Sequence, residues 1–173
     1  MAESARRIVL LGCAGAGKTT LARRLGERSG MPVICLDAIW RPDWGPADVG
    51  YFRDLMAKAH AADAWISDGN FALATFDIRL PRADLIVWLD RPRLHCAWRA
   101  IGRVFRPGEA HRPGDLTKAL RFIRGCERIN RPRIEAARLQ HGAQVPVIHL
   151  RGDRDIRAFL LSFVDRSLPA RVH

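Results

Sequence analysis

The hydrophobic pattern of the chain changes its period repeatedly. Short apolar runs, typical of strands buried on both faces, alternate with longer stretches in which apolar residues recur every three or four positions, as along an amphipathic helix. The short runs predict strands at 8–12, 32–36, 64–70 (which ends in a turn), 84–90 and 145–150.

The periodic stretches predict the helices that connect these strands. Gly30 is placed to end the first helix, Pro92 to open a later one and Asp155 to cap the last. The segment 106–115 contains two Pro-Gly pairs and is expected to form a loop. The predicted helices cover 18–29, 48–62, 92–105 and 116–140, with an interruption near 130–132, and a final helix near residue 155.

Strands that alternate with helices predict parallel βαβ units, an α/β fold in which helices cover both faces of one sheet. The 173 residues are long enough for one domain, 1–173, and contain no internal repeat, low-complexity segment or linker. Ligands bind such sheets at the carboxyl ends of the strands. The residues expected at that edge are Gly12, Asp37, Asp68, Asp90 and Arg151.

The stretch GCAGAGKTT lies between the first predicted strand and the first helix. It fits the phosphate-loop pattern GxxxxGK[ST], in which glycines let backbone N–H groups surround a phosphate at the positive end of the helix dipole. Lys18 is expected to reach the β- and γ-phosphates of ATP, and the Thr19 hydroxyl to bind Mg²⁺. The predicted nucleotide-binding residues of this loop are Gly12, Cys13, Ala14, Gly15, Ala16, Gly17, Lys18, Thr19 and Thr20.

The same stretch has a rival interpretation as the end of an export signal, because Arg6 and Arg7 precede it. The four apolar residues 8–11 are too few for the core of a signal peptide. No apolar run approaches the roughly 18 residues that span a bilayer. The four cysteines are widely spaced, so neither structural disulfides nor a zinc site is expected. We expect a soluble, cytoplasmic protein.

A phosphate loop does not by itself define a reaction. ATP-hydrolysing motors usually carry a glutamate directly after the Mg²⁺-linked aspartate, but here Asp68 is followed by Gly69 and Asp90 by Arg91. The Asn-Lys-x-Asp element that recognises guanine is also absent from the sequence. The remaining expectation is transfer of a phosphoryl group to an organic acceptor, which depends on positioning and charge neutralisation.

Arginines are expected to stabilise the phosphoryl group during this transfer. His95, Arg99 and Arg103 recur at four-residue spacing on one face of a predicted helix, and we assign Arg99 and Arg103 to catalysis. The alternative is that they are solvated surface arginines in an arginine-rich chain.

A lid is expected at about 104–133, where Arg106 and Arg112 flank the Pro-Gly sequence that would close over ATP. Beyond this loop, arginines recur at three- and four-residue intervals and form a basic stripe. This stripe either contacts phosphates or is a solvated surface. Its members are Arg121, Arg124, Arg128 and Arg131.

Two aspartates are candidates for the chemistry beside the phosphate loop. Asp68 is expected to bind Mg²⁺ through water, and Asp37 to contact the acceptor and take its hydroxyl proton. A helix cap or a turn is the structural alternative for each. An acceptor-binding region is expected at about 37–64, where Trp40 and Trp44 either stack on a base or sugar or pack in the core.

The formal net charge is +11, and almost all of the positive charge comes from arginine. Such a surface attracts polyanions, including nucleic acid and nucleotide phosphates. The leading hypothesis is an ATP- and Mg²⁺-dependent kinase for a small-molecule or nucleotide acceptor. We expect it to act as a monomer or homodimer and to have no membrane partner. The alternative is a nucleotide-dependent, nucleic-acid-binding regulatory protein that lacks kinase activity.

The chain resembles the P-loop nucleoside/nucleotide kinase superfamily, of adenylate kinase and shikimate kinase type. Within it, the chain is most similar to bacterial DNA topology modulation (FlaR-like) proteins. The resemblance covers nearly the whole chain. The stretches that carry it are GCAGAGKTT, CLDAIWRPDW, WISDGN, RLPRADLIVWLDRPR, CAWRAIGR and RPRI.

The resemblance implies a three-layer αβα P-loop NTPase fold with a five-stranded parallel sheet, a small acceptor-binding region and a short lid. Arg99 and Arg103 match the paired arginines that precede the lid in adenylate kinases. The sequence RGDRD at 151–155 matches the loop that packs on adenine, which implies nucleotide contacts for Arg151 and Asp153.

The acceptor side departs from the adenylate kinases, which carry Asp-Gly-Phe-Pro-Arg where this chain has Asp-Gly-Asn-Phe at 68–71. Residues that surround a nucleoside monophosphate are therefore missing, and AMP is not the expected acceptor. Arg79 and Arg82 are weaker candidates for contacts to an acceptor phosphate.

Overall fold

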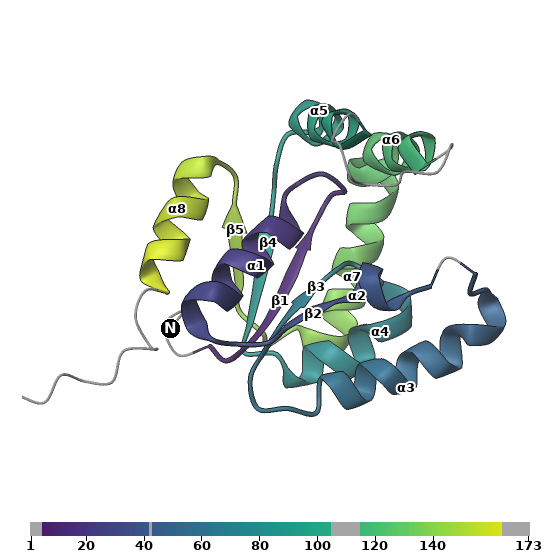
Figure 1. The fold of residues 1–173 in the computed structure, drawn as a ribbon, viewed down its shortest axis with the longest axis vertical. Coiled ribbons are helices and arrows are strands. Elements are labelled where there is room, and N and C mark those ends of the chain that lie inside the picture. Colours follow the sequence, from purple (N-terminus) through teal and green to yellow (C-terminus); the bar gives the residue numbers. More distant parts are fainter. Residues whose placement is uncertain (1–4, 42, 105–114, 164–173) are drawn as a thin grey trace, which may run out of the picture.

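Five parallel strands form a single sheet in the order β2-β3-β1-β4-β5 (Figure 1). The computed structural model describes residues 5–41, 43–104 and 115–163. The prediction of an α/β fold with a five-stranded parallel sheet is confirmed. The strands are β1 (Arg7–Gly12), β2 (Val33–Cys35), β3 (Trp65–Asp68), β4 (Leu85–Leu89) and β5 (Val147–Leu150).

Helices cover both faces of the sheet and complete three layers, as Figure 1 shows. Two helices, α1 (Lys18–Ser29) and α8 (Asp153–Ser162), pack on one face. The opposite face is covered by α3 (Val49–Ala59), α4 (Ala72–Arg79) and α7 (Arg131–Gly142). Shorter helical segments are α2 (Leu36–Ile39), η2 (Pro46–Asp48) and η3 (Leu80–Arg82).

The central strand β1 supplies both hydrophobic cores. Ile8 and Leu10 face the cluster under α1 and α8, whereas Val9 and Leu11 face the cluster under α3, α4 and α7. All four side chains are fully buried, and each contributes roughly 1.5–3 kcal/mol by leaving water. The start of the phosphate loop at the end of β1 is therefore attached to a strand that is buried on both faces.

Two helices, α5 (Arg93–Val104) and α6 (Asp115–Gly125), lie side by side beyond the carboxyl ends of the strands (Figure 1). The interruption expected near 130–132 is instead a five-residue π-helical segment, η4 (Cys126–Asn130), which joins α6 to α7. Pro132 is the second residue of α7, directly after this π-helical segment, and has no N–H to donate to the turn before it.

Two further predictions need correction. The second strand ends at Cys35, so Asp37 lies in the first turn of α2 rather than at the end of a strand. The helix α4 was not predicted from the sequence, because Thr75, Phe76 and Ile78 are poor helix formers. Its packing against α3 and α7 overrides this local preference.

A chain of buried polar groups connects α3, β3 and α4. The His60 ring lies 2.8 Å from the Met56 carbonyl oxygen through Nδ1 and 2.9 Å from Ser67 Oγ through Nε2. Because a carbonyl only accepts, Nδ1 carries the proton and Nε2 accepts from Ser67. Ser67 Oγ in turn accepts a 3.0 Å hydrogen bond from Arg79 Nη1. A neutral imidazole fits this arrangement, with the Ser67 hydroxyl donating to Nε2.

Burial lowers the pKa of His60 from 6.5 to about 4, with the Met56 hydrogen bond opposing and the charges of Arg79 and Arg82 assisting. Between these two values the unfolded chain binds a proton that the folded chain excludes, so the free energy of unfolding falls as the pH falls. We expect the titration of His60 to lower the free energy of unfolding by about 2 kcal/mol when the pH falls from 7.5 to 5.

The His60→Gln variant checks this prediction, because glutamine can donate and accept at the same place but does not titrate. Urea denaturation at pH 7.5 and pH 5 should show a smaller loss of unfolding free energy for the variant than for the natural chain. Identical losses in the two proteins would contradict the assignment of the titration to His60.

Candidate active site

The phosphate loop depends on three glycines with positive φ angles: 143° at Gly12, 79° at Gly15 and 99° at Gly17. A β-carbon at Gly12 would lie 2.6 Å from the Leu89 carbonyl oxygen, and one at Gly15 would lie 2.3 Å from the Cys96 carbonyl oxygen. The loop is therefore pressed between the end of β4 and the backbone of α5. Only glycine fits both positions.

The Lys18 side chain folds back over its own loop. Its Nζ donates to the carbonyl oxygens of Gly12, at 3.0 Å, and Cys13, at 3.1 Å. Lys18 is also the first residue of α1, whose first N–H groups have no intrahelical acceptor. An ammonium group and free helix N–H groups in one loop are a donor set that fits an anion such as a polyphosphate.

Arg99 reaches the phosphate loop from α5; its predicted role in catalysis stays a prediction. Its Nη2 lies 3.7 Å from the position that a β-carbon on Gly17 would take. The pKa of the Cys96 thiol is lowered, first by a hydrogen bond with Cys13 and then by the positive charges of Lys18, Arg91 and Arg99. Positive charge therefore converges on the loop. The side chain of Arg103 lies outside the described part of the structure.

Asp68 is the last residue of β3 and pairs in register with Leu10 of the neighbouring β1. The side chain is buried, and the Cys35 thiol donates to its Oδ2 at 3.8 Å. Asp37 is exposed in α2, and the charges of both aspartates act on the buried Arg79. Asp37 thus follows β2 and Asp68 ends β3, two strands that lie on the same side of β1 in the sheet.

Within the described residues, no group of three His, Cys, Asp or Glu side chains could hold a metal ion. Mg²⁺ commonly takes one or two protein ligands and completes its shell with water and substrate phosphates. The exposed Thr19 hydroxyl and the Asp68 carboxylate fit this sparse ligand set. Their role in binding Mg²⁺ stays a prediction.

Asn70 is a contact residue of the phosphate loop that the sequence analysis missed. Its Nδ2 donates to the Gly12 carbonyl oxygen at 2.9 Å, and its Oδ1 accepts from the Gly12 amide at 3.4 Å. The sequence contained a signal, because Asn70 stands where the chain departs from the adenylate kinase pattern directly after β3. Its partner, however, is distant in the sequence.

Arg79 is fully buried, which corrects its tentative assignment to an acceptor phosphate. Its guanidinium donates to the carbonyl oxygens of Gly69, at 3.0 Å, and Asn70, at 2.6 Å, as well as to Ser67. Burial lowers the pKa of Arg79 to about 9, so the group stays charged at neutral pH. Arg82 donates to the Ala61 carbonyl oxygen at 2.8 Å.

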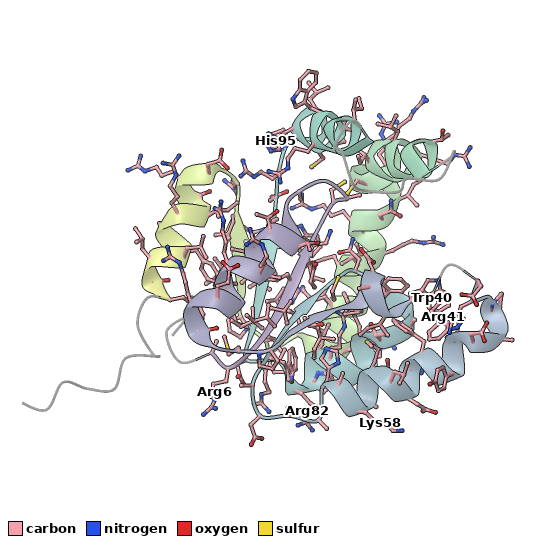
Figure 2. All side chains as sticks on the ribbon, viewed as in Figure 1. Arg6, Trp40, Arg41, Lys58, Arg82 and His95 are labelled. Carbon is pink, nitrogen blue, oxygen red and sulfur yellow. The ribbon has the colours of Figure 1, made fainter. Side chains whose placement is uncertain are left out.

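The aromatic residues of the predicted acceptor region pack against one another. The ring centroids of Trp40 lie 5.7 Å from Trp44, 5.2 Å from Phe52 and 5.9 Å from Phe71. Trp40 and Trp44 are half-buried on the hydrophobic cluster under α3 and α4, which favours the core-packing alternative. Figure 2 shows Trp40 beside α3 and His95 on α5, in well-separated parts of the molecule.

The predicted adenine end of the site follows β5. Asp153 pairs with the buried guanidinium of Arg91, which holds the pKa of Asp153 below its usual range. Arg151 is exposed, and its amide donates to Asp155 Oδ2 at 2.7 Å. Asp155 also accepts from the Gly152 amide, so it caps α8 as predicted. Contacts of Arg151 and Asp153 with a nucleotide stay a prediction.

The basic stripe divides in two. Arg121, Arg124 and Arg128 are exposed along α6 and η4. Arg131 instead forms a two-point ion pair with Asp90, at 2.7 and 3.2 Å, which attaches the start of α7 to the end of β4. Arg106 and Arg112, and with them most of the Pro-Gly sequence of the predicted lid, lie outside the described residues.

The chain is similar in sequence to one kinase over part of its length. A shikimate kinase of Symbiobacterium thermophilum is 35% identical over 98 residues, which make up 48% of this chain and 56% of that protein. The chain thus matches little more than half the length of this relative. No protein-family model matches the chain.

Solved structures of two kinases share the fold over most of the chain. A shikimate kinase from Acinetobacter baumannii superposes with a TM-score of 0.61 at 18% identity, over 91% of this chain and 90% of that one. A gluconokinase from Sinorhizobium meliloti gives a TM-score of 0.55 at 17% identity, over 91% of each chain. The chain has the fold of the P-loop kinases.

This P-loop kinase fold agrees with the wider resemblance predicted from the sequence. These similarities do not test the narrower resemblance to DNA topology modulation proteins, which stays a prediction. In the described residues, no helix combines the length and the apolar composition needed to cross a membrane.

The packing of α5 on the phosphate loop can be tested with two glycine substitutions. Gly15→Ala combines a strained φ with a clash against the Cys96 carbonyl, and should lower the free energy of unfolding by roughly 3 kcal/mol or more. Gly30→Ala is the matched control, because its φ is 69° but nothing lies within 4 Å. This control substitution should lower the free energy of unfolding by only about 1 kcal/mol. Equal losses on chemical denaturation would contradict the close approach of α5.

Proposed function

We propose that the chain is an ATP- and Mg²⁺-dependent phosphotransferase that moves the γ-phosphate of ATP to a hydroxyl group of a small acceptor. The observation that carries this proposal is the position of the Arg99 guanidinium beside Gly17, in the same loop that holds the ammonium of Lys18. Phosphoryl transfer needs cations from separate elements around the phosphate that moves, because negative charge is spread over its oxygens in the transition state.

In this proposal the phosphate loop binds the nucleotide. The amides at the start of α1 hold the phosphates, and Lys18 leaves the carbonyls of Gly12 and Cys13 to reach them. Thr19 and Asp68 hold Mg²⁺, which would neutralise charge on the β- and γ-phosphates. Arg151 and Asp153 contact the adenine end, next to Arg91.

The reaction forms one bond and breaks one. The acceptor hydroxyl oxygen attacks the γ-phosphorus, the bond from that phosphorus to the bridging oxygen breaks, and ADP leaves with the electron pair. Asp37 takes the proton of the acceptor hydroxyl, for which an exposed carboxylate next to the site is suited. Arg99 and Arg103 stabilise the charge on the moving phosphoryl group.

A hydroxylated small molecule is a better acceptor for this site than a nucleoside monophosphate. Arg79, the last residue of α4, is fully buried and donates to protein carbonyls, and Arg41 of the predicted acceptor region is paired with Asp43. The shikimate kinase and gluconokinase with this fold are named for hydroxylated acids. The carboxylate of Asp37 suits hydroxyl groups, with which it can form hydrogen bonds.

A second candidate function rests on the exposed arginines of α6 and η4. Arg121, Arg124 and Arg128 could bind nucleic-acid phosphates without sequence specificity. Such binding should weaken steeply between 50 and 200 mM salt, and should change when ATP is added. Titration of a fluorescent DNA duplex at two salt concentrations would test this second function. An affinity that does not change with salt, or the absence of binding, would count against it.

Phosphorus NMR of Mg·ATP with the protein tests the main proposal. The spectra are compared with and without a pool of sugars, sugar acids, cyclic polyols, nucleosides and nucleoside monophosphates. A new phosphoester signal that needs the pool would establish a kinase, and fractionation of the pool would identify the acceptor class. Free phosphate released at the same rate with and without the pool would contradict phosphoryl transfer to these acceptors.

Lys18→Ala should lower the rate of phosphoryl transfer by about 100-fold or more, because a preorganised cation at the phosphates is removed. Lys58→Ala, an exposed lysine on α3, is the matched control and should leave the rate unchanged. Both variants should unfold cooperatively in urea. Full activity of a folded Lys18→Ala variant would overturn the assignment.

A further inference from the structure

Nucleotide binding would remove one of the hydrogen-bond partners of the Gly12 carbonyl group. In the structure this oxygen accepts two side-chain hydrogen bonds, one from Lys18 Nζ at 3.0 Å and one from Asn70 Nδ2 at 2.9 Å. Under the proposed function, on which this inference rests, Lys18 must turn away from the loop to reach phosphate. Gly12 is buried, so loss of every partner would leave a desolvated, unsatisfied carbonyl.

We propose that Asn70 is a positioning residue that keeps the phosphate loop in shape when Lys18 moves to the nucleotide. Its side-chain amide bonds to both backbone polar groups of Gly12, because Oδ1 also accepts from the Gly12 amide at 3.4 Å. The Gly12 carbonyl then retains a partner in both positions of the lysine. Lys18 can exchange loop carbonyls for phosphate oxygens without leaving Gly12 unsatisfied.

The turn that carries Asn70 is itself held in place. Arg79 donates to the Asn70 carbonyl oxygen at 2.6 Å and to the Gly69 carbonyl oxygen at 3.0 Å. Gly69 has a φ of 132°, and a β-carbon there would lie 3.0 Å from Leu36 Cβ. A buried, charged guanidinium that spans two successive carbonyls leaves this turn little freedom.

The residue after Asn70 adds a second constraint. Phe71 has a φ of 26°, which is unusual for a residue with a side chain, and its ring packs 5.3 Å from Phe52. The strained backbone persists because hydrogen bonds on one side and aromatic packing on the other hold it. Asn70 therefore presents its amide to Gly12 from a rigid support.

Asn70 acts through the loop rather than on the substrate. Both polar atoms of its side chain bond to the backbone of Gly12, which attaches the amide to the loop. Its removal should weaken ATP binding and raise the KM for ATP, with a smaller effect on the KM for the acceptor. A general loss of structure would change both.

The first test is equilibrium binding of Mg·ATP to the full chain. Asn70→Ala should raise the Kd about tenfold, because only the nucleotide-bound form then contains an unsatisfied Gly12 carbonyl. Gln140→Ala, which removes an exposed side-chain amide on α7, is the matched control and should leave the Kd unchanged.

A double-variant cycle with Lys18→Met distinguishes positioning from a general structural role. Without the ammonium, the Gly12 carbonyl lacks its lysine partner in both the free and the bound form. Asn70→Ala should then change the Kd less than about twofold in the Lys18→Met background, instead of tenfold. An equal fold-change in both backgrounds would overturn the inference.

Unfolding of the ligand-free chain supplies a measurement that needs no nucleotide. Either single variant leaves the Gly12 carbonyl one side-chain partner, whereas the double variant leaves none. The denaturation midpoint of the double variant should therefore fall by more than the two single shifts combined. Additive shifts would overturn the inference even if the double variant binds ATP too weakly to measure.

The outcomes separate this inference from the proposed function. Tight binding of Mg·ATP by the natural chain and equally tight binding by Asn70→Ala would overturn the role of Asn70 and leave the kinase proposal intact. Absence of Mg·ATP binding by the natural chain would overturn the proposed function itself. In that case the coupling between Asn70 and Lys18 would be tested by the denaturation midpoints of the ligand-free variants alone.

Discussion

The site depends on the close approach of the phosphate-loop backbone to its neighbours. Gly12 lies against the carbonyl at the end of β4, and Gly15 lies against the carbonyl of Cys96 in α5. These contacts leave no room for a β-carbon and require backbone angles that glycine adopts most easily. The loop is therefore shaped by a strand and a helix whose contact residues, Leu89 and Cys96, come 77 and 81 positions after Gly12 and Gly15 in the chain. The same packing brings Arg99 to Gly17.

The cations of the site bond to backbone carbonyls and to carboxylates of the chain. Lys18 bonds to loop carbonyls, Arg91 to Asp153 and Arg131 to Asp90, so these cations have partners. A hydrogen bond to a carbonyl can be exchanged for one to a phosphate at modest net cost, because one partner replaces another. The arrangement suits a loop that binds and releases a polyanion.

A continuous polar chain lies beneath the acceptor side. It runs from the Met56 carbonyl through His60, Ser67 and Arg79 to Asn70, and from there to Gly12. Each link is a buried or half-buried hydrogen bond, so a defect in one leaves its neighbours unsatisfied. This chain gives a physical reason for the Asp-Gly-Asn-Phe sequence: the asparagine connects the turn after β3 to the phosphate loop.

Local pattern alone determined the parallel α/β sheet, the helix Lys18–Ser29, the phosphate loop and the position of Asp68 at the end of β3, because apolar runs, glycine spacing and caps act over a few residues. Only the tertiary structure decided that α4 is helical, that Arg79 is buried and that Asn70, separated from Gly12 by 58 positions, grips the loop. Those outcomes depend on which distant segments pack together, and propensity and spacing contain no information about such pairs.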